Sequence, residues 1–134
     1  MKAIELSTPR SKVEFLYNDM TVGEAIKKMS KRRYSMIPVL EKDSNRYLYS
    51  ISSGDLLYRI IVETKLEDAY ALPLSVVSVE RLVLAAPADS DPADLADLVA
   101  NQNYIPLVDA KGVFAGIVTR KAYLYYLINQ QQGE

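Results

Sequence analysis

The sequence contains one pattern twice, and this duplication constrains the fold more than any other feature. Each copy consists of an apolar run, a turn rich in charged residues, glycine or asparagine, and a second apolar run. The runs are 34–40 and 47–52 in the first copy, and 103–108 and 113–119 in the second. Two apolar runs joined by such a turn predict a β-hairpin. The chain of 134 residues is therefore expected to repeat one supersecondary unit.

Amphipathic helices are predicted before and after each hairpin. Thr21 is placed to cap the first helix, in which Glu24 and Lys28 are spaced to pair one turn apart. Asp91 and Pro92 fit the cap and first turn of the helix before the second hairpin. The apolar positions that recur at helical spacing are Val22, Ala25, Ile26 and Met29; Leu56, Leu57, Ile60 and Ile61; Leu95, Leu98 and Val99; and Leu124, Leu127 and Ile128.

The linker between the copies, 66–89, is expected to hold a short helix and then an extended strand at 82–85. By symmetry, Glu14-Phe15-Leu16 is expected to form the strand before the first copy. The predicted fold class is α+β, with α/β layers built from tandem βαββα repeats. Residues 1–67 would hold an N-terminal segment and repeat 1, and residues 68–134 the linker and repeat 2, together one compact module.

Composition argues against several classes of function. The net charge of −1 disfavours a nucleic-acid binder, which would carry a basic excess. Cysteine and histidine are absent, so thiol chemistry and the commonest general base and metal ligand are missing. The sequence contains no P-loop, metal-ligand cluster or catalytic triad pattern. No apolar run approaches the ~18 residues of a membrane span, and residues 1–5 lack the core of a signal peptide. We expect a cytoplasmic protein that is not an enzyme and needs no metal or other cofactor.

Thr119, Arg120 and Lys121 form the clearest candidate site. Thr119 sits where a helix N-cap belongs, and on its own it needs no further explanation. Two cations in the first turn, however, oppose the helix dipole, which prefers acidic residues there. A bound phosphate would resolve this conflict, because backbone N–H groups and both cations would converge on it. Gly116, just before, would let a ligand approach the strand backbone closely.

The last helix predicts a homodimer. Tyr123, Tyr125 and Tyr126 lie among its apolar positions, so the helix is apolar around most of its circumference. A helix of this kind is normally buried, and in a small chain a second subunit is the expected cover. The basic cluster in 27–33 fits a solvated helix face, with a docking surface for an acidic partner as the alternative.

The two copies resemble a CBS-domain pair, also called a Bateman module, over about Lys12 to Ile128. The motifs that carry the resemblance are Ile37-Pro38-Val39, Ser52-Ser53-Gly54-Asp55, Ile105-Pro106-Leu107-Val108-Asp109 and Gly116-Ile117-Val118-Thr119. The resemblance implies repeats packed with pseudo-two-fold symmetry, a disc-like homodimer, and adenosine-containing ligands in clefts between the repeats.

A closer resemblance is to the stand-alone CBS proteins of Gram-positive bacteria that bind cyclic di-AMP. It is carried by Ser11-Lys12-Val13, by the strand 34–39, and by Gly116-Ile117-Val118-Thr119-Arg120-Lys121-Ala122, which lacks the usual terminal Asp. It implies a cyclic di-AMP receptor that signals to a separate protein, such as a metabolic enzyme or a second-messenger synthetase. The alternatives are a sensor of AMP, ADP or ATP and a ligand-free structural dimerisation module.

The resemblance also implies roles for individual residues. The strand from Tyr34 would form an adenine wall, although Met36 and Ile37, taken singly, fit core residues of an ordinary strand better. Ser52 with Asp55 would hold a ribose or phosphate. Ser52 and Asp55 equally fit a capping box, and Ala122 stands at the place of Asp55 in the second copy. The expected nucleotide-binding residues are Lys12, Tyr34, Ser35, Met36, Ile37, Gly116, Val118, Thr119, Arg120 and Lys121, with a second cleft at Ser52, Asp55, Tyr104 and Ile105.

Overall fold

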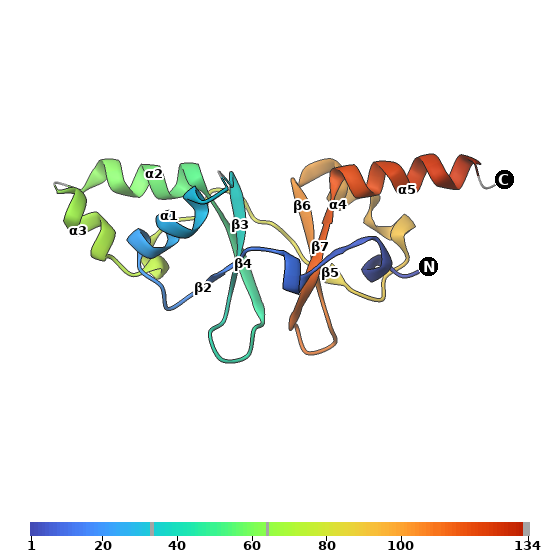
Figure 1. The fold of residues 1–134 in the computed structure, drawn as a ribbon, viewed down its shortest axis with the longest axis horizontal. Helices are drawn as coiled ribbons and strands as arrows, with labels where there is room; N and C mark the ends of the chain where they lie inside the picture. Colours follow the sequence, from blue (N-terminus) through green and yellow to red (C-terminus); the bar gives the residue numbers. More distant parts are fainter. Residues whose placement is uncertain (33, 64, 133–134) are drawn as a thin grey trace. The chain divides into compact units, whose positions relative to one another are not determined.

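The computed structural model describes residues 1–32, 34–63 and 65–132, and the chain divides into two compact units (Figure 1). The repeat-1 unit is Glu14–Leu82. The repeat-2 unit joins Met1–Val13 to the stretch that begins at Val83. This division differs from the expected one between 67 and 68 in two ways. The linker up to Leu82 packs with repeat 1, and the N-terminal segment packs with repeat 2.

Backbone hydrogen bonds explain both differences. In the linker, Leu72 O accepts from Val22 N at 2.8 Å, and Leu74 N donates to Met20 O at 2.9 Å. In the N-terminal segment, Ala3 N donates to Ser90 O at 2.7 Å. The side chain of Ala3 is fully buried in the core of the repeat-2 unit. Neither set of contacts joins residues that are neighbours in the sequence.

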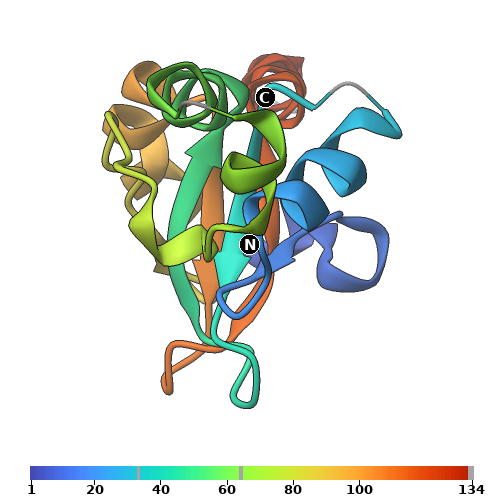
Figure 2. The same cartoon turned by 90° about the vertical axis from the view of Figure 1, so that its left-hand side faces the viewer.

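The repeat-1 unit has the predicted order of strand, helix, hairpin and helix. Its elements are β2 (Leu16–Tyr17), α1 (Val22–Ser30), β3 (Met36–Leu40), β4 (Tyr47–Ser52) and α2 (Ser53–Val62), followed by α3 (Leu66–Ala71) and the 3₁₀ turn η3 (Leu74–Val76). Strand β3 is central, parallel to β2 and antiparallel to β4. Figure 2 faces this unit, with α2 and α3 in front of its strands.

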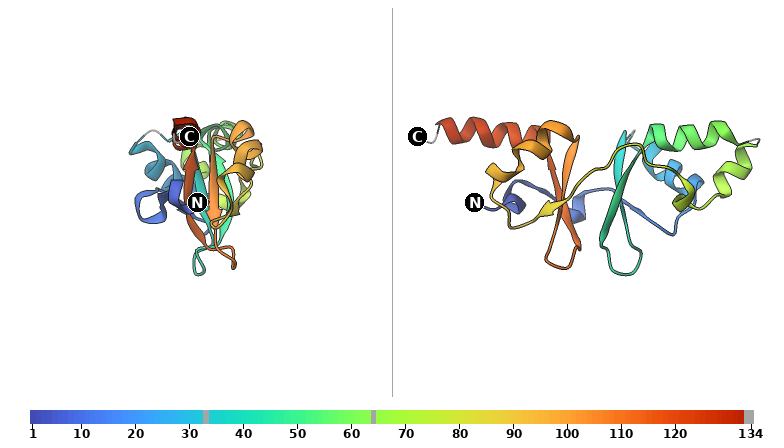
Figure 3. Two further views of the ribbon diagram at one scale, coloured as in Figure 1. Left: turned by 90° about the vertical axis from the view of Figure 1, so that its right-hand side faces the viewer. Right: turned by 180° about the vertical axis from the view of Figure 1, so that it is seen from behind.

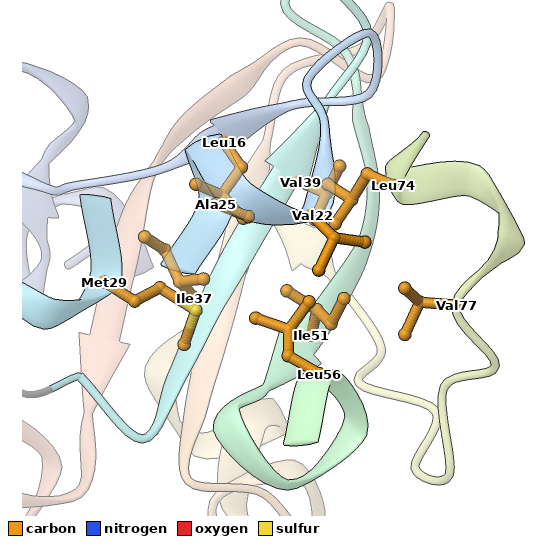
Figure 4. Packing of buried hydrophobic residues seen from close by; sticks show 10 residues of the cluster. All are labelled: Leu16, Val22, Ala25, Met29, Ile37, Val39, Ile51, Leu56, Leu74 and Val77. Atoms are coloured by element: carbon orange, nitrogen blue, oxygen red, sulfur yellow. The ribbon is translucent and has the colours of Figure 1, made fainter. Parts of the chain in front are cut away.

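Helix α1 packs on the sheet as its apolar period predicts. Val22, Ala25 and Met29 are buried, and Thr21 with Glu24 forms a reciprocal capping box at the helix start. Figure 4 shows Met29 against Ile37 of β3. The core is completed by residues of all three strands, α2 and the linker, namely Leu16, Val39, Ile51, Leu56, Leu74 and Val77.

The repeat-2 unit follows the same plan. Its elements are β5 (Ala86–Pro87), the 3₁₀ turn η4 (Pro92–Leu95), α4 (Ala96–Asn101), β6 (Tyr104–Val108), β7 (Phe114–Thr119) and α5 (Arg120–Gln132). The N-terminal segment adds η1 (Ala3–Leu6), β1 (Thr8–Pro9) and η2 (Arg10–Lys12), and β1 lies beside β7 (Figure 3). The sheet order is β1-β7-β6-β5. The predicted tandem βαββα repeats are thus confirmed.

Three local predictions are wrong. The strand expected at 82–85 lies at Ala86–Pro87. The backbone N–H and carbonyl of Leu84 are hydrogen-bonded to the side-chain amide of Gln102, so a side chain occupies them in place of a neighbouring strand. The strand expected at 14–16 includes only Leu16 and continues to Tyr17. The pair expected between Glu24 and Lys28 does not form, because Lys28 pairs with Glu14 at 3.7 Å and Glu24 accepts from Thr21 in the helix cap.

Arg33 of the basic cluster lies outside the described residues. Within them, no helix is both long and apolar enough to cross a membrane.

Two glycines in the repeat-1 unit occupy equivalent positions, the second residue of α1 and of α2, but have different surroundings. A Cβ on Gly23 would lie 3.1 Å from both Cβ and the carbonyl oxygen of Tyr70 in α3. The hydrogen bonds at Leu72 and Leu74 hold this part of the linker in place. A Cβ on Gly54 would meet only Ser52 Oγ, at 3.6 Å. The close approach of α3 to α1 therefore favours a glycine at position 23, whereas position 54 has room for a side chain.

We predict opposite effects of alanine at these two positions. Gly54→Ala should raise the free energy of unfolding by about 0.5–1 kcal/mol, since alanine restricts the unfolded chain and favours the helix. Gly23→Ala should lower it, because the new methyl group would crowd Tyr70 at 3.1 Å and the linker hydrogen bonds hold Tyr70 in place. Denaturant unfolding of both variants measures this. Equal stabilisation by the two substitutions would contradict the close packing of α3 on α1.

Candidate functional site

The start of α5 exposes two cations. Thr119 Oγ1 accepts from Ala122 N at 3.1 Å, which confirms the predicted N-cap. Arg120 and Lys121 follow it, both exposed, and the first turn has no acidic residue. Lys121 Nζ lies 5.9 Å from the ring centroid of Tyr125. The turn therefore combines a helix N-terminus with two positive charges, an arrangement that favours an anion.

Arg120 also has a contact within the fold. Its Nε donates to Val99 O, in α4, at 3.2 Å. A cation beside the terminal carbonyls of a helix is favourable, so the fold supplies one reason for Arg120 that sequence reasoning missed. Among the residues that the structure describes, the two Nη groups have no partner. They remain available to a ligand.

Gly116 has a different role from the one expected. A Cβ at this position would lie 2.5 Å from Thr8 O and 3.3 Å from Pro9 Cα. Strand β1 pairs with β7 in register with Gly116. The space that the missing side chain leaves is therefore filled by the chain's own N-terminal segment, and the prediction that a ligand approaches here is wrong.

The start of α2 carries a different arrangement. Ser52 Oγ accepts from Asp55 N at 3.0 Å, and Asp55 Oδ2 accepts from Ser52 N at 2.9 Å, which completes a capping box. Asp55 Oδ1 accepts from Glu80 N of the linker at 3.2 Å. Asp55 is buried, and both carboxylate oxygens already have backbone partners. The capping interpretation is thus observed, and Asp55 additionally fixes the linker.

The expected adenine wall is partly core. Ile37 is buried among the residues of the repeat-1 core, so its side chain cannot pack on a base. Tyr34 and Met36 are half-buried and Ser35 is exposed. Ser35 O accepts from Ser53 N at 2.9 Å, which ties the strand to the start of α2. Only the residues before Ile37 present side chains outside the core.

In the repeat-2 unit, Ile105 and Val118 are fully buried and Tyr104 nearly so, and a ligand contact at these residues stays a prediction. Lys12, at the end of η2, is exposed. The structure brings together two sets of expected residues, one in each unit. The repeat-1 set is Tyr34, Ser35, Met36, Ile37, Ser52 and Asp55; the repeat-2 set is Lys12, Tyr104, Ile105, Gly116, Val118, Thr119, Arg120 and Lys121.

A hollow of about 470 Å³ lies beside the start of α2. Of its lining residues, only Asp55 is among the site residues predicted from the sequence, and the linker part was missed because the linker has no periodic pattern that marks it as part of a site. The lining residues are Gly54, Asp55, Tyr58, Ser78, Val79 and Glu80. The carboxylate of Glu80 makes this hollow less suited to a phosphate than the first turn of α5. Within the described residues, no group of three or more acidic side chains is placed to hold a metal ion.

Tyr123 fixes the first turns of α5 in the repeat-2 unit. It is buried, and its hydroxyl donates to Pro92 O at 2.8 Å. Burial raises the pKa of this phenol, and the nearby Tyr126, Asp91 and Asp94 raise it further. The hydroxyl therefore stays protonated at neutral pH and acts as a hydrogen-bond donor that anchors the helix beneath the two exposed cations.

Comparison with known proteins gives both a family and a fold. The CBS-domain pattern matches residues 3–62 and 78–129. No curated protein matches the chain. Among solved structures, CbpB in complex with c-di-AMP has a TM-score of 0.84 at 15% identity, over 99% of this chain and 88% of CbpB. CbpB of Listeria monocytogenes, also with c-di-AMP, has a TM-score of 0.78 at 20% identity, over 98% of each chain.

Two further structures are similar. A CBS domain-containing protein of unknown function from Bacillus anthracis has a TM-score of 0.81 at 22% identity, over 96% of this chain and 94% of its own. CBSX2 in complex with AMP has a TM-score of 0.74 at 19% identity, over 97% and 98%. At these identities the likeness shows the fold. With two helix–hairpin–helix repeats and two matches to one domain pattern, the chain belongs to the CBS-domain family and contains a pair of CBS domains.

Proposed function

We propose that the protein is a regulatory receptor for an adenine nucleotide and that its preferred ligand is cyclic di-AMP. The observation that carries the proposal is the first turn of α5, where Arg120 and Lys121 stand exposed at a capped helix start with no acid beside them. This turn would hold a phosphate through charge-assisted hydrogen bonds, with Lys12 as a further cation. Tyr34, Ser35 and Met36, in the repeat-1 unit, are a separate set of candidates for contact with a nucleotide base.

The state of the carboxylates favours a cyclic dinucleotide over a linear one. A linear nucleotide offers a ribose diol, which a free carboxylate could grip. Ala122 provides none at α5, and both oxygens of Asp55 at α2 accept from the backbone. In a cyclic dinucleotide each ribose has its 3′ oxygen esterified, so no diol is present. The similar structures of CbpB with c-di-AMP support this choice, and CBSX2 with AMP supports a linear nucleotide as the second candidate.

Calorimetric titration with cyclic di-AMP, AMP, ADP and ATP in turn tests the proposal. We expect cyclic di-AMP to bind most tightly. Tighter binding of AMP, ADP or ATP would establish the second candidate. Absence of heat with all four would leave a structural dimerisation module.

Alanine at Arg120 or Lys121 should weaken nucleotide binding about 10- to 150-fold, since a charge-assisted hydrogen bond is worth roughly 1.5–3 kcal/mol. The empty protein should change little in stability. Arg120→Ala loses the bond to Val99 O but also removes a cation from the wrong end of a helix dipole. Lys111→Ala, which removes an exposed cation of the same unit in the hairpin turn, is the matched control. The measurement is thermal melting with and without nucleotide.

These melting curves separate two roles of Arg120. Loss of ligand-induced stabilisation with an unchanged apo melting temperature supports a phosphate contact. A lowered apo melting temperature with ligand-induced stabilisation intact would assign Arg120 to the fold alone and transfer the phosphate to Lys12 or Lys121.

We also propose that the protein forms a homodimer through the four helices that flank the hairpins, and α2 and α5 carry this proposal. Both helices expose large apolar side chains, and Ile61 is 69% exposed and Leu124 56%. The other exposed apolar residues of these helices are Leu57, Tyr58, Val62, Tyr125, Leu127 and Ile128. A monomer rarely leaves so much apolar surface on two helices in contact with water.

Sedimentation of the wild type at micromolar concentration should therefore show a dimer, and Ile61→Glu should shift it to the monomer. Leu82→Glu is the control, because Leu82 is 77% exposed but lies in the linker, outside both helices. A wild-type monomer, or dissociation by both substitutions alike, would refute an interface built on α2.

A third proposal concerns how the protein passes on the signal of a bound nucleotide. We expect a protein partner whose docking depends on nucleotide occupancy, since a partner that prefers one state must change ligand affinity by the same factor. Affinity capture from lysate, with and without cyclic di-AMP, should recover different partners. Identical sets in the two conditions would argue against a ligand-controlled switch.

A further inference from the structure

The two units carry opposite charges on corresponding helices. Helix α1 follows β2 and precedes β3 in the repeat-1 unit, and η4 with α4 holds the same place between β5 and β6 in the repeat-2 unit. Residues 27–32 contain three lysines and one arginine and no acid. Residues 89–97 contain four aspartates and no lysine or arginine. One helical segment is therefore basic and its counterpart is acidic.

The caps of these segments show which positions correspond. The side chain of Thr21 accepts from the backbone at the start of α1, and Asp91 Oδ1 accepts from Ala93 N at 3.0 Å at the start of η4. Six residues after the caps stand Lys27 and Asp97, respectively. The sign of the charge at this position is thus reversed between the two units.

The charged side chains lie away from the cores of their own units. With 3.6 residues per turn, Lys27 and Lys31 share the face of α1 opposite its buried residues. In the repeat-2 unit, Leu95 is buried in the core and Val99 packs against it, whereas Asp97 between them is exposed. Lys27 and Lys31 are also exposed. None of these three charged side chains forms an ion pair with another described residue.

The symmetry of a homodimer gives these charges two possible arrangements. In a two-fold dimer, a contact made by one copy is repeated by the other. If like units meet, α1 faces the partner's α1 and α4 faces the partner's α4, so each contact brings together like charges. If unlike units meet, the dimer has two contacts between α1 and α4, and both join opposite charges. Like charges facing one another suppress a pairing.

The apolar helices do not distinguish the two arrangements. Both α2 and α5 expose large apolar side chains, so either helix could cover the other or a copy of itself. The choice between the arrangements therefore depends on the charged faces of α1 and α4.

We propose that the homodimer is antiparallel, with the repeat-1 unit of each copy packed on the repeat-2 unit of the other. The basic face of Lys27 and Lys31 would then lie against the acidic face around Asp97 of a second copy. This inference rests on the proposed homodimer and specifies which surface of the partner each unit contacts.

Charge reversal tests the arrangement by sedimentation of the full chain. Lys27→Glu and Asp97→Lys should each weaken the dimer about tenfold, since each dimer loses two attractions and gains two repulsions. The two substitutions in one chain should restore the affinity, because the signs are exchanged and the contact is attractive again. Lys111→Glu, which reverses an exposed charge in the hairpin turn of the repeat-2 unit, is the control and should have no effect.

A dimer of like units gives the opposite sign. Lys27→Glu and Asp97→Lys would then each relieve a repulsion, and the dimer would become tighter. Unchanged or tighter dimers of the single variants, or no restoration in the double variant, would overturn the antiparallel arrangement.

Cross-linking tests the same contact independently of affinity. The chain has no cysteine, so introduced cysteines react without a background. Lys27→Cys and Asp97→Cys are purified separately, mixed until their subunits exchange, and treated with a short bismaleimide. We expect covalent dimers in the mixture and none in either variant alone. Asp43→Cys mixed with Lys111→Cys, both exposed in hairpin turns, reports cross-links from random collision.

The outcomes separate this inference from the homodimer itself. Cross-linking of Lys27→Cys with its own copy would show that like units meet and would overturn the proposal. No cross-link above the collision control, in variants that sediment as dimers, would place the interface elsewhere and overturn it too. A wild-type monomer at micromolar concentration would refute the homodimer on which the inference rests.

Discussion

The buried carboxylate of Asp55 connects three parts of the repeat-1 unit, namely the end of the hairpin, the start of α2 and the linker. One oxygen accepts from Ser52 at the end of the hairpin, and the other accepts from Glu80 in the linker. The helix that begins between them is α2. Hydrogen bonds to a charged group are worth about 1.5–3 kcal/mol each, and a buried carboxylate without them is strongly destabilising. Hairpin, helix and linker are therefore held together at one side chain.

The repeat-2 unit has no carboxylate at the corresponding helix start. Thr119 caps α5 as Ser52 caps α2, but Ala122 replaces the acid. Gln102 takes over the contact with the linker, since its side-chain amide both donates to and accepts from the backbone of Leu84. The first turn of α5 carries no acidic residue and presents two cations, of which Arg120 also bonds to Val99 O. The two helix starts therefore differ in chemistry, with an acidic residue in the first turn of α2 and two cations in the first turn of α5.

Sequence reasoning recovered the parts of the fold that depend on local period. The hairpins, the faces of α1 and α2, and the caps at Thr21, Ser52 and Thr119 all follow from spacing within a few residues. The contacts that it missed connect distant positions, as Arg120 with Val99 and Gly116 with Thr8. No pattern in a single sequence marks such pairs. Ile37 and Val118, which belong to the expected nucleotide-binding set, lie in the cores of their units, because an apolar residue of a strand fits a core position as readily as a ligand contact.

The placement of the first thirteen residues has a consequence for synthesis on the ribosome. Arg10 bonds to Phe114 O at 3.4 Å, across 104 positions of sequence. At about 5–20 residues per second, roughly 5–20 s pass between the emergence of these two residues. Residues 14–82 form a contiguous unit and can complete their core in that interval. Segment 1–13, by contrast, must wait without its partner strand until β7 is made, so it takes its place later than residues 14–82, which follow it in the sequence.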